Sequence, residues 1–158
     1  MYKQTCHWPI RFLYLAFFIC SSGCPAGWVR HGSSCYYIED SKTFSMSVAQ
    51  QKCRNFGADL AIIRSAEEND FILRLVTEKL NNAYGVWLGL QRKADSKLYW
   101  IDGTPLEGHY QNWDIREPNN SGGSENCVNM YRGGSPGKWN DAPCFWALTP
   151  SVLCQKSI

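Results

Sequence analysis

Apolar residues recur at helical spacing in two stretches of the first half of the chain. The first stretch, residues 46–56, follows Ser45 and ends before Gly57, which can stop a helix by adopting the left-handed backbone conformation. This pattern predicts an amphipathic helix. Its expected inner face consists of Val48, Ala49, Lys52, Cys53 and Phe56.

A second helix is predicted after Ser65, which forms a capping-box pattern with Glu68. In such a box the hydroxyl and the carboxylate each accept a hydrogen bond from a free backbone N–H at the start of the helix. Between the two helices, residues 58–63 are apolar and short, which predicts a strand or an extended segment. The apolar positions of the second helix are Phe71, Ile72, Leu75, Val76 and Leu80.

Short β-prone runs dominate the rest of the chain, and together with two helices they predict an α+β fold. Between Gly103 and Gly137 the chain is rich in Gly, Asn, Ser and Pro, and so long a loop region is usually either functional or disordered. Trp113, Cys127 and Trp139 favour an ordered region, because they can bury surface and crosslink the chain. The predicted strands are residues 35–39, 86–90, 98–101, 128–131 and 152–155.

The N-terminal segment has the pattern of a secretory signal peptide. Lys3, His7 and Arg11 precede an apolar run over residues 12–20, and the small residues 21–23 follow. A membrane span needs about 20 apolar residues, so this run is too short to cross a bilayer. We predict a signal peptide over residues 1–23 and one soluble, secreted extracellular domain over residues 24–158, with a retained anchor as the less favoured alternative.

Charge excludes one class of partner. Removing Lys3 and Arg11 with the signal would lower the 16 Lys and Arg residues to 14, equal to the 14 Asp and Glu residues. A domain of near-zero net charge has no basic stripe for nucleic acid or for an anionic membrane surface. We therefore expect neither nucleic-acid binding nor membrane insertion.

The chain has eight cysteines, of which Cys6 and Cys20 lie in the predicted signal. An even number in an exported domain indicates disulfides, and no Cys-x-x-Cys spacing favours a zinc site. Spacing favours a local pair between Cys24 and Cys35 and leaves the pairing of the other four undecided. Those four are Cys53, Cys127, Cys144 and Cys154.

Oxygen-bearing side chains gather in two segments of the loop-rich region. The first is Glu117-Pro118-Asn119 with Glu125 downstream, and the second is Trp139-Asn140-Asp141. Calcium takes about six to eight oxygen ligands from carboxylates, amides, backbone carbonyls and water. We predict a calcium site that leaves coordination positions for a ligand, and its side chains are Glu117, Asn119, Glu125, Asn140 and Asp141.

Taken together, these features resemble a C-type lectin domain of the long form, over essentially all of residues 24–158. The resemblance rests on the two helices, the cysteine order, the run Trp87-Leu88-Gly89-Leu90 and the two oxygen-rich segments. It implies a C-type lectin-like fold with small antiparallel sheets and a long calcium-binding loop region. It also implies two further disulfides, Cys53 with Cys154 and Cys127 with Cys144.

The resemblance further implies calcium-dependent binding of mannose-type sugars, namely mannose, glucose, N-acetylglucosamine and fucose, on cell or microbial surfaces. Two neighbouring sugar hydroxyls would coordinate calcium, donate hydrogen bonds to Glu117 and Glu125, and accept them from Asn119 and Asn140. Asp141 would add a carboxylate. In this family the sequence Gln-Pro-Asp, in place of Glu-Pro-Asn, goes with galactose.

The same resemblance implies a cis peptide bond before Pro118, which would point both flanking side chains at one ion. The cis form costs only about 0.5–1 kcal/mol before a proline. Family members with an auxiliary calcium ion use acids where this chain has Arg92, Asn120 and Asn126. We therefore expect one calcium ion, and a loop that is less rigidly held without it.

Other interpretations of the same residues remain. Asn119-Asn120-Ser121 matches the N-glycosylation sequon. A hydrolase using Glu117 and Glu125 as acid and base would need neither the amides nor the proline, so an enzyme is not predicted. The stronger rival is a lectin-like domain that binds a protein, a mineral or ice.

Valency is the last expectation from the sequence. A shallow single-sugar site binds weakly, and tight attachment needs several linked sites. The chain has no coiled-coil or collagen pattern, so a homo-oligomer formed by the domain itself is expected to provide them. Innate immunity, adhesion, feeding and biomineralisation all stay open as biological roles.

Overall fold

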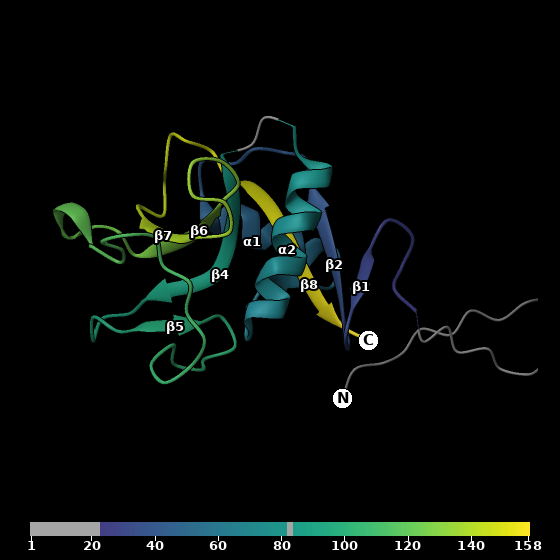
Figure 1. Ribbon diagram of the computed structural model, residues 1–158, viewed down its shortest axis with the longest axis horizontal. Coiled ribbons are helices and arrows are strands. Elements are labelled where there is room, and N and C mark those ends of the chain that lie inside the picture. Colours follow the sequence, from purple (N-terminus) through teal and green to yellow (C-terminus); the bar gives the residue numbers. More distant parts are fainter. Residues whose placement is uncertain (1–22, 82–83) are drawn as a thin grey trace, which may run out of the picture.

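The computed structural model describes residues 23–81 and 84–158, and it has the α+β architecture that the sequence predicts (Figure 1). The predicted signal peptide lies outside the described residues except for Gly23. The helices are α1 (Met46–Asn55), α2 (Ala66–Lys79) and the short 3-10 helix η1 (Ser121–Gly123). The strands are β1 (Val29–His31), β2 (Ser34–Glu39), β3 (Asp59–Leu60), β4 (Gly85–Arg92), β5 (Leu98–Trp100), β6 (Cys127–Tyr131), β7 (Trp139–Ala142) and β8 (Ser151–Ser157).

One sheet connects all the strands. Its order is β1-β2-β8-β4-β6-β7, with β3 paired to β8 and β5 paired to β4. Only the β4–β8 pair is parallel among the described strands. Figure 1 places β5, η1 and the surrounding loops at the end of the molecule opposite the C-terminus. The loop-rich region is therefore ordered and is carried by β4, β6 and β7.

Strand β4 is buried on both faces, which explains its nearly continuous apolar sequence. Val86 and Leu88 belong to a hydrophobic cluster that includes Ile72 of α2. Trp87, whose side chain alternates to the other face, belongs to a second cluster with Met46 of α1. The two helices thus contribute to separate clusters on opposite faces of the same strand.

The predicted inner face of helix α1 is confirmed at Ala49 and Cys53 but not throughout. Met46, Ala49 and Cys53 are buried, whereas Val48 and Phe56 are 48% and 43% exposed. The sequence expectation was wrong at Val48 and Phe56. For Phe56 the reason is that the helix ends before it, at Asn55, so that its ring packs edge-on against other aromatic rings, those of Trp28 and Tyr37.

Helix α2 follows its prediction closely. The Glu68 amide donates to the Ser65 hydroxyl at 3.1 Å, which is the first half of the capping box. The Glu68 carboxylate accepts from the Arg64 amide at 2.7 Å, one residue earlier than the box predicts. Its buried face matches the expected positions, with Phe71 partly buried and Ile72, Leu75, Val76 and Leu80 buried.

Two strands were not predicted. Strand β1 pairs with β2 in a hairpin, and β7 pairs with β6, so that the Trp139-Asn140-Asp141 segment is a strand and not a loop. Conversely, only Asp59 and Leu60 of the expected extended segment form a strand, paired to β8. Short strands such as β1 and β7 depend on their partners more than on their own composition.

Three disulfides connect these elements in the pairing that the resemblance implied. Cys24–Cys35 closes the β1–β2 hairpin region, and Cys53–Cys154 joins α1 to β8. Cys127–Cys144 joins the start of β6 to the residues just after β7. This last bridge links β6, which lies within the loop-rich region, to the residues that follow β7.

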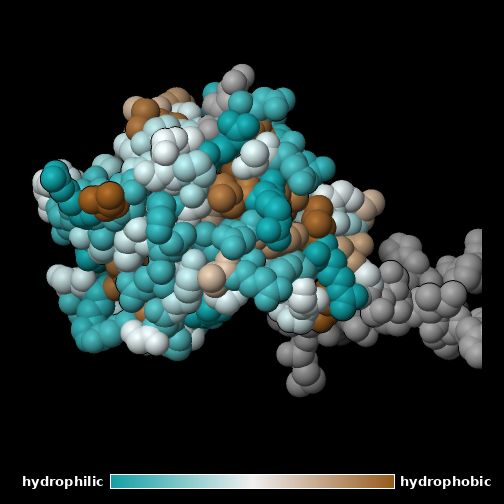
Figure 2. Space-filling view, viewed as in Figure 1, coloured by the Kyte–Doolittle hydropathy of each residue, from teal (hydrophilic) through white to brown (hydrophobic). Residues whose placement is uncertain are grey.

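The surface in Figure 2 is mainly hydrophilic, and its apolar patches are small and separated. The most exposed large apolar side chains in the described chain are Ile115 at 85% and Phe145 at 74%. Phe145 stacks on Phe44 with the ring centroids 6.0 Å apart. Within the described residues, no helix combines the length and apolar character needed to cross a bilayer.

Candidate metal centre and ligand site

The long loop is anchored on Trp139, the first residue of β7. We call residues 112–126 the site loop. The Trp139 amide donates to the Asn112 carbonyl and the Asp114 amide donates to the Trp139 carbonyl, both at 2.9 Å. The Trp139 side chain is fully buried and is flanked edge-on by the rings of Trp100, Tyr110 and Trp113. Trp139 is thus a core residue that attaches the loop to the sheet.

Three carboxylates meet where the site loop passes the other end of β7. Glu117, Glu125 and Asp141 each place a carboxylate oxygen within 4.8 Å of the other two. Burial raises the pKa of Glu117, and the adjacent carboxylate of Asp141 and the charge of Glu125 raise this pKa further. The three charges repel one another, so a bound cation would relieve the cluster.

Asn119 lies against this cluster. Its side-chain amide donates to Glu117 at 2.8 Å, and its backbone amide donates to Asp141 at 3.0 Å. The peptide bond between Glu117 and Pro118 is cis. The Asn119 side-chain amide and the Glu117 carboxylate therefore lie side by side. The amide is a hydrogen-bond donor and the carboxylate is an acceptor.

The rest of the loop is folded onto the same carboxylates. The Asn120 amide donates to Asp141 at 3.0 Å, and the Asn120 side chain accepts from the Glu125 amide at 3.0 Å. The Ser121 amide donates to the Glu125 carboxylate at 2.7 Å. Asn120 adopts a left-handed backbone with φ of 46°, which asparagine tolerates better than most residues. These contacts hold Glu125 beside Glu117 although eight positions separate them.

Asn140 stands apart from the other four predicted ligands in its contacts. Its side-chain amide nitrogen donates to Asn129 of β6 at 3.2 Å, and the Asn140 residue is 7% exposed. The Asn129 amide nitrogen is buried and has no hydrogen-bond partner in the described structure. Within the described contacts, Asn140 makes no side-chain hydrogen bond to Glu117, Glu125 or Asp141.

Sequence reasoning missed the partner of Asp141. Arg92, at the end of β4, donates to the fully buried Asp141 carboxylate at 2.6 Å. The sequence indicated Arg92 only as a residue unsuited to a second metal ion. Nothing in the sequence pairs it with Asp141, because the two residues are 49 positions apart and meet through the sheet.

The donor set fits calcium. The three carboxylates bring several oxygens together, and Asn119 and Asn140 lie beside them in sequence with amide oxygens. Hard cations such as calcium prefer such ligands, and the group contains no cysteine or histidine that would favour zinc.

The family comparison agrees with the fold. Residues 40–156 match the family model of the lectin C-type domain. The chain belongs to this family. Its members are generally binding domains and not enzymes, and they generally bind calcium.

Two relatives illustrate how the lectin domain occurs in longer chains. Ladderlectin of Oncorhynchus mykiss is 34% identical over 137 residues, covering 85% of this chain and 69% of its own length. Asialoglycoprotein receptor 2 of Rattus norvegicus is 37% identical over 139 residues, covering 82% of this chain and 42% of its own length. The lectin domain thus spans less than half of the receptor.

Solved structures with similar folds belong to proteins of different kinds. The C-type carbohydrate-recognition domain of cow CD23, in the presence of a GlcNAc2Man3 oligosaccharide, superimposes with a TM-score of 0.74 and 33% identity, covering 87% of this chain and 98% of that one. A calcium-independent type II antifreeze protein superimposes with a TM-score of 0.69 and 31% identity, covering 85% and 95%. The fold alone does not choose between these ligands.

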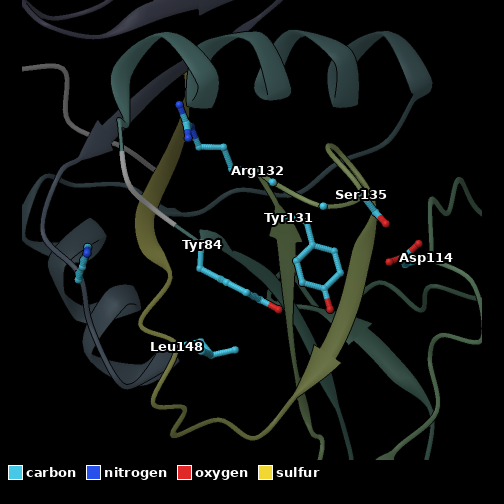
Figure 3. Close-up of a pocket in the computed structure, with 9 residues that line it drawn as sticks. Tyr84, Asp114, Tyr131, Arg132, Ser135 and Leu148 are labelled. Carbon is cyan, nitrogen blue, oxygen red and sulfur yellow. The ribbon is translucent and has the colours of Figure 1, made fainter.

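A pocket of about 470 Å³ in this lectin domain is lined in part by Asp114 of the site loop (Figure 3). Tyr84 and Tyr131 line it, with their rings in an edge-on contact at 5.3 Å, and Asp114 and Ser135 lie across from them. Burial raises the pKa of Tyr131. The lining includes none of the three clustered carboxylates, so the candidate metal centre lies outside this pocket.

Proposed function

We propose that this chain is a secreted lectin domain that binds mannose-type sugars through calcium. The observation that carries the proposal is the cluster of Glu117, Glu125 and Asp141 beside the Asn119 amide. A calcium ion held there would supply open coordination positions for two sugar hydroxyls. The side chains around the ion would form hydrogen bonds with the hydrogens and the remaining lone pairs of these two hydroxyls.

The side chains at the site differ in whether they accept or donate hydrogen bonds to the sugar. Glu117 and Glu125 can only accept hydrogen bonds when ionised, while the Asn119 amide nitrogen can only donate. The Asn119 nitrogen already donates one hydrogen to Glu117 and has a second hydrogen to offer. The Asn140 nitrogen uses one hydrogen on Asn129 and likewise keeps another. Sugars with two equatorial neighbouring hydroxyls match this alternation of acceptors and donors.

Secretion is part of the proposal. Three disulfides form in the described domain, and such bonds persist in oxidising compartments. The charged and apolar pattern of residues 1–23 is that of a signal peptide. We propose glycans on cell or microbial surfaces as the partners, with self-association of the domain as the source of tight attachment.

The rival function is binding of a non-glycan surface, and the similarity to an antifreeze protein favours it. That neighbour is described as calcium-independent. A domain that works without calcium has no use for three mutually repelling carboxylates around an asparagine. The cluster in this chain therefore favours the calcium-dependent sugar site.

A glycan array probed with and without calcium tests the proposal. We expect mannose-type glycans to bind in calcium and every such signal to disappear in excess EDTA, because the ion forms part of the sugar site. Calcium added back after chelation should restore the same signals, which controls for damage to the protein. Glycan binding that persists in EDTA, or ice or mineral binding in its place, would contradict the proposal.

Acid is expected to release the ligand. A raised pKa means that Glu117 binds a proton at higher pH than an ordinary glutamate, and protons compete with calcium for the same oxygens. Calcium affinity should therefore begin to fall above the ordinary titration range of a glutamate and continue to fall as the pH decreases.

The measurement is mannan capture across a pH series at scarce and at abundant calcium. Mass action requires the midpoint of release to move to lower pH when calcium is abundant. A midpoint that ignores the calcium concentration would show that protons act elsewhere in the protein. In the calcium-free protein the effect of acid on the cluster is opposite. Protonating Glu117 removes repulsion between the carboxylates, so acid should not loosen the cluster through this residue.

A further inference from the structure

We infer that Arg92 is a positioning residue whose built-in positive charge assembles the site loop before calcium binds. The inference rests on the proposed function only in taking Glu117, Glu125 and Asp141 as the calcium ligands. It concerns the protein without metal, in which the loop is expected to keep its fold, whereas the sequence alone predicted a loop less rigidly held without calcium.

The Arg92 side chain forms hydrogen bonds to three separate segments. Its guanidinium donates to the Asp141 carboxylate in β7 at 2.6 Å and to the Glu125 carbonyl in the site loop at 3.3 Å. It also donates to the Ser96 carbonyl in the β4–β5 turn at 3.2 Å. The Arg92 backbone amide donates to the Asn126 carbonyl at 2.8 Å, so the same residue also fixes the end of the loop.

Burial makes this charge necessary. The Asp141 side chain is 0% exposed and the Arg92 side chain is only 14% exposed. A carboxylate without solvent needs a compensating charge and a full set of donors. Arg92 forms the ion pair found for Asp141 in the described chain, and the backbone amides of Asn119 and Asn120 complete the donor set.

The arginine thereby reaches all three candidate ligands. It contacts Asp141 directly and Glu125 through its carbonyl oxygen. Glu117 is reached through Asn119, which donates to both Glu117 and Asp141. A guanidinium suits this role because its planar fork offers several donors in fixed directions, which a single ammonium group lacks.

The charge count also favours a single divalent ion. Three carboxylates carry three negative charges, and Arg92 offsets one of them, which leaves two. One calcium ion neutralises that remainder. Without Arg92 the calcium-free cluster would hold three uncompensated charges, one of them fully buried, so the loop would open until metal is added.

Hydrogen exchange in excess EDTA tests this directly, because the amides of Asn119 and Asn120 donate to Asp141. In the wild-type chain both amides should be protected without calcium. In Arg92→Gln their exchange in EDTA should accelerate by at least about tenfold, as expected when a buried ion pair loses one partner. Calcium should restore protection in the variant.

Two further variants separate the role of the contact from that of charge. Arg92→Lys keeps the charge but not the fork, so its exchange should fall between wild type and Arg92→Gln. Lys93→Gln removes the same charge at the next residue, whose ammonium group donates a hydrogen bond to Gln91 and forms no ion pair in the described structure, and it should behave as wild type.

Wild-type amides that exchange in EDTA as fast as an unfolded chain would overturn the inference. So would equal protection in Arg92→Gln and Lys93→Gln. If Arg92→Gln does not fold, exchange of these amides in Arg92→Lys as fast as in an unfolded chain overturns it, because the charge is still present, and retained protection supports it. None of these measurements uses sugar, so a negative glycan array would reject the proposed function and leave this result standing.

Discussion

Exchanging acid for amide at position 117 and amide for acid at position 119 is expected to switch the sugar preference from mannose to galactose. In the structure the Asn119 amide nitrogen donates to the Glu117 carboxylate at 2.8 Å. The double variant Glu117→Gln with Asn119→Asp reverses the direction of this hydrogen bond but keeps it. It also keeps the net charge, so calcium should still bind.

The expected size follows from the contacts that change. A sugar hydroxyl that meets a donor where it needs an acceptor loses about 1–3 kcal/mol at a desolvated site. Each misplaced contact thus changes the affinity ratio of the two sugars by about fivefold to 150-fold. The measurement is competition by free mannose and free galactose for an immobilised glycan, with calcium binding checked separately by calorimetry.

Single variants provide the matched controls. Asn119→Asp places two carboxylates side by side, and Glu125→Gln deletes one acceptor, so each should weaken binding of both sugars without switching the preference. A double variant that binds calcium and still selects mannose would contradict the donor and acceptor assignment.

Replacing Asp141 by asparagine is expected to abolish calcium binding and to destabilise the protein even without calcium. The buried carboxylate accepts from Arg92 at 2.6 Å and from the amides of Asn119 and Asn120 at 3.0 Å. An amide of the same shape cannot balance the Arg92 charge. Removing one partner of a buried ion pair typically costs about 3–5 kcal/mol, and the partial exposure of Arg92 places this case near the lower end.

Urea unfolding in EDTA measures this loss without interference from metal binding. Glu107→Gln is the matched control, because its ion pair with Lys97 is exposed, with side-chain exposures of 60% and 78%, and should leave the midpoint unchanged. If Arg92 and Asp141 act as a pair, combining Arg92→Gln with Asp141→Asn should cost less than the sum of the two single changes. An Asp141→Asn variant as stable as wild type would show that the pair contributes nothing.

The local sequence determined the two helices and most of the strands. Helical spacing and the Ser65 cap predicted α2 correctly, because its start signal and its apolar positions all lie within the 16 residues from Ser65 to Leu80. The inner face of α1 was harder to predict, because Phe56 lies beyond the helix end and Val48 faces solvent. Strand β7 was missed because its four residues are Trp, Asn, Asp and Ala, which carry no alternating pattern.

The sequence by itself also determined which chemistry is present at the candidate site. The types and spacing of five residues predicted a calcium site, and the resemblance to lectins implied a sugar as its ligand. These residues are Glu117, Asn119, Glu125, Asn140 and Asp141. Only the tertiary structure decided how those side chains are held. Arg92 meets Asp141 from a strand 49 positions away, and Asn140 bonds to Asn129 across a strand pair. Such contacts follow from strand register and burial, which depend on the whole sheet and leave no local pattern in the chain.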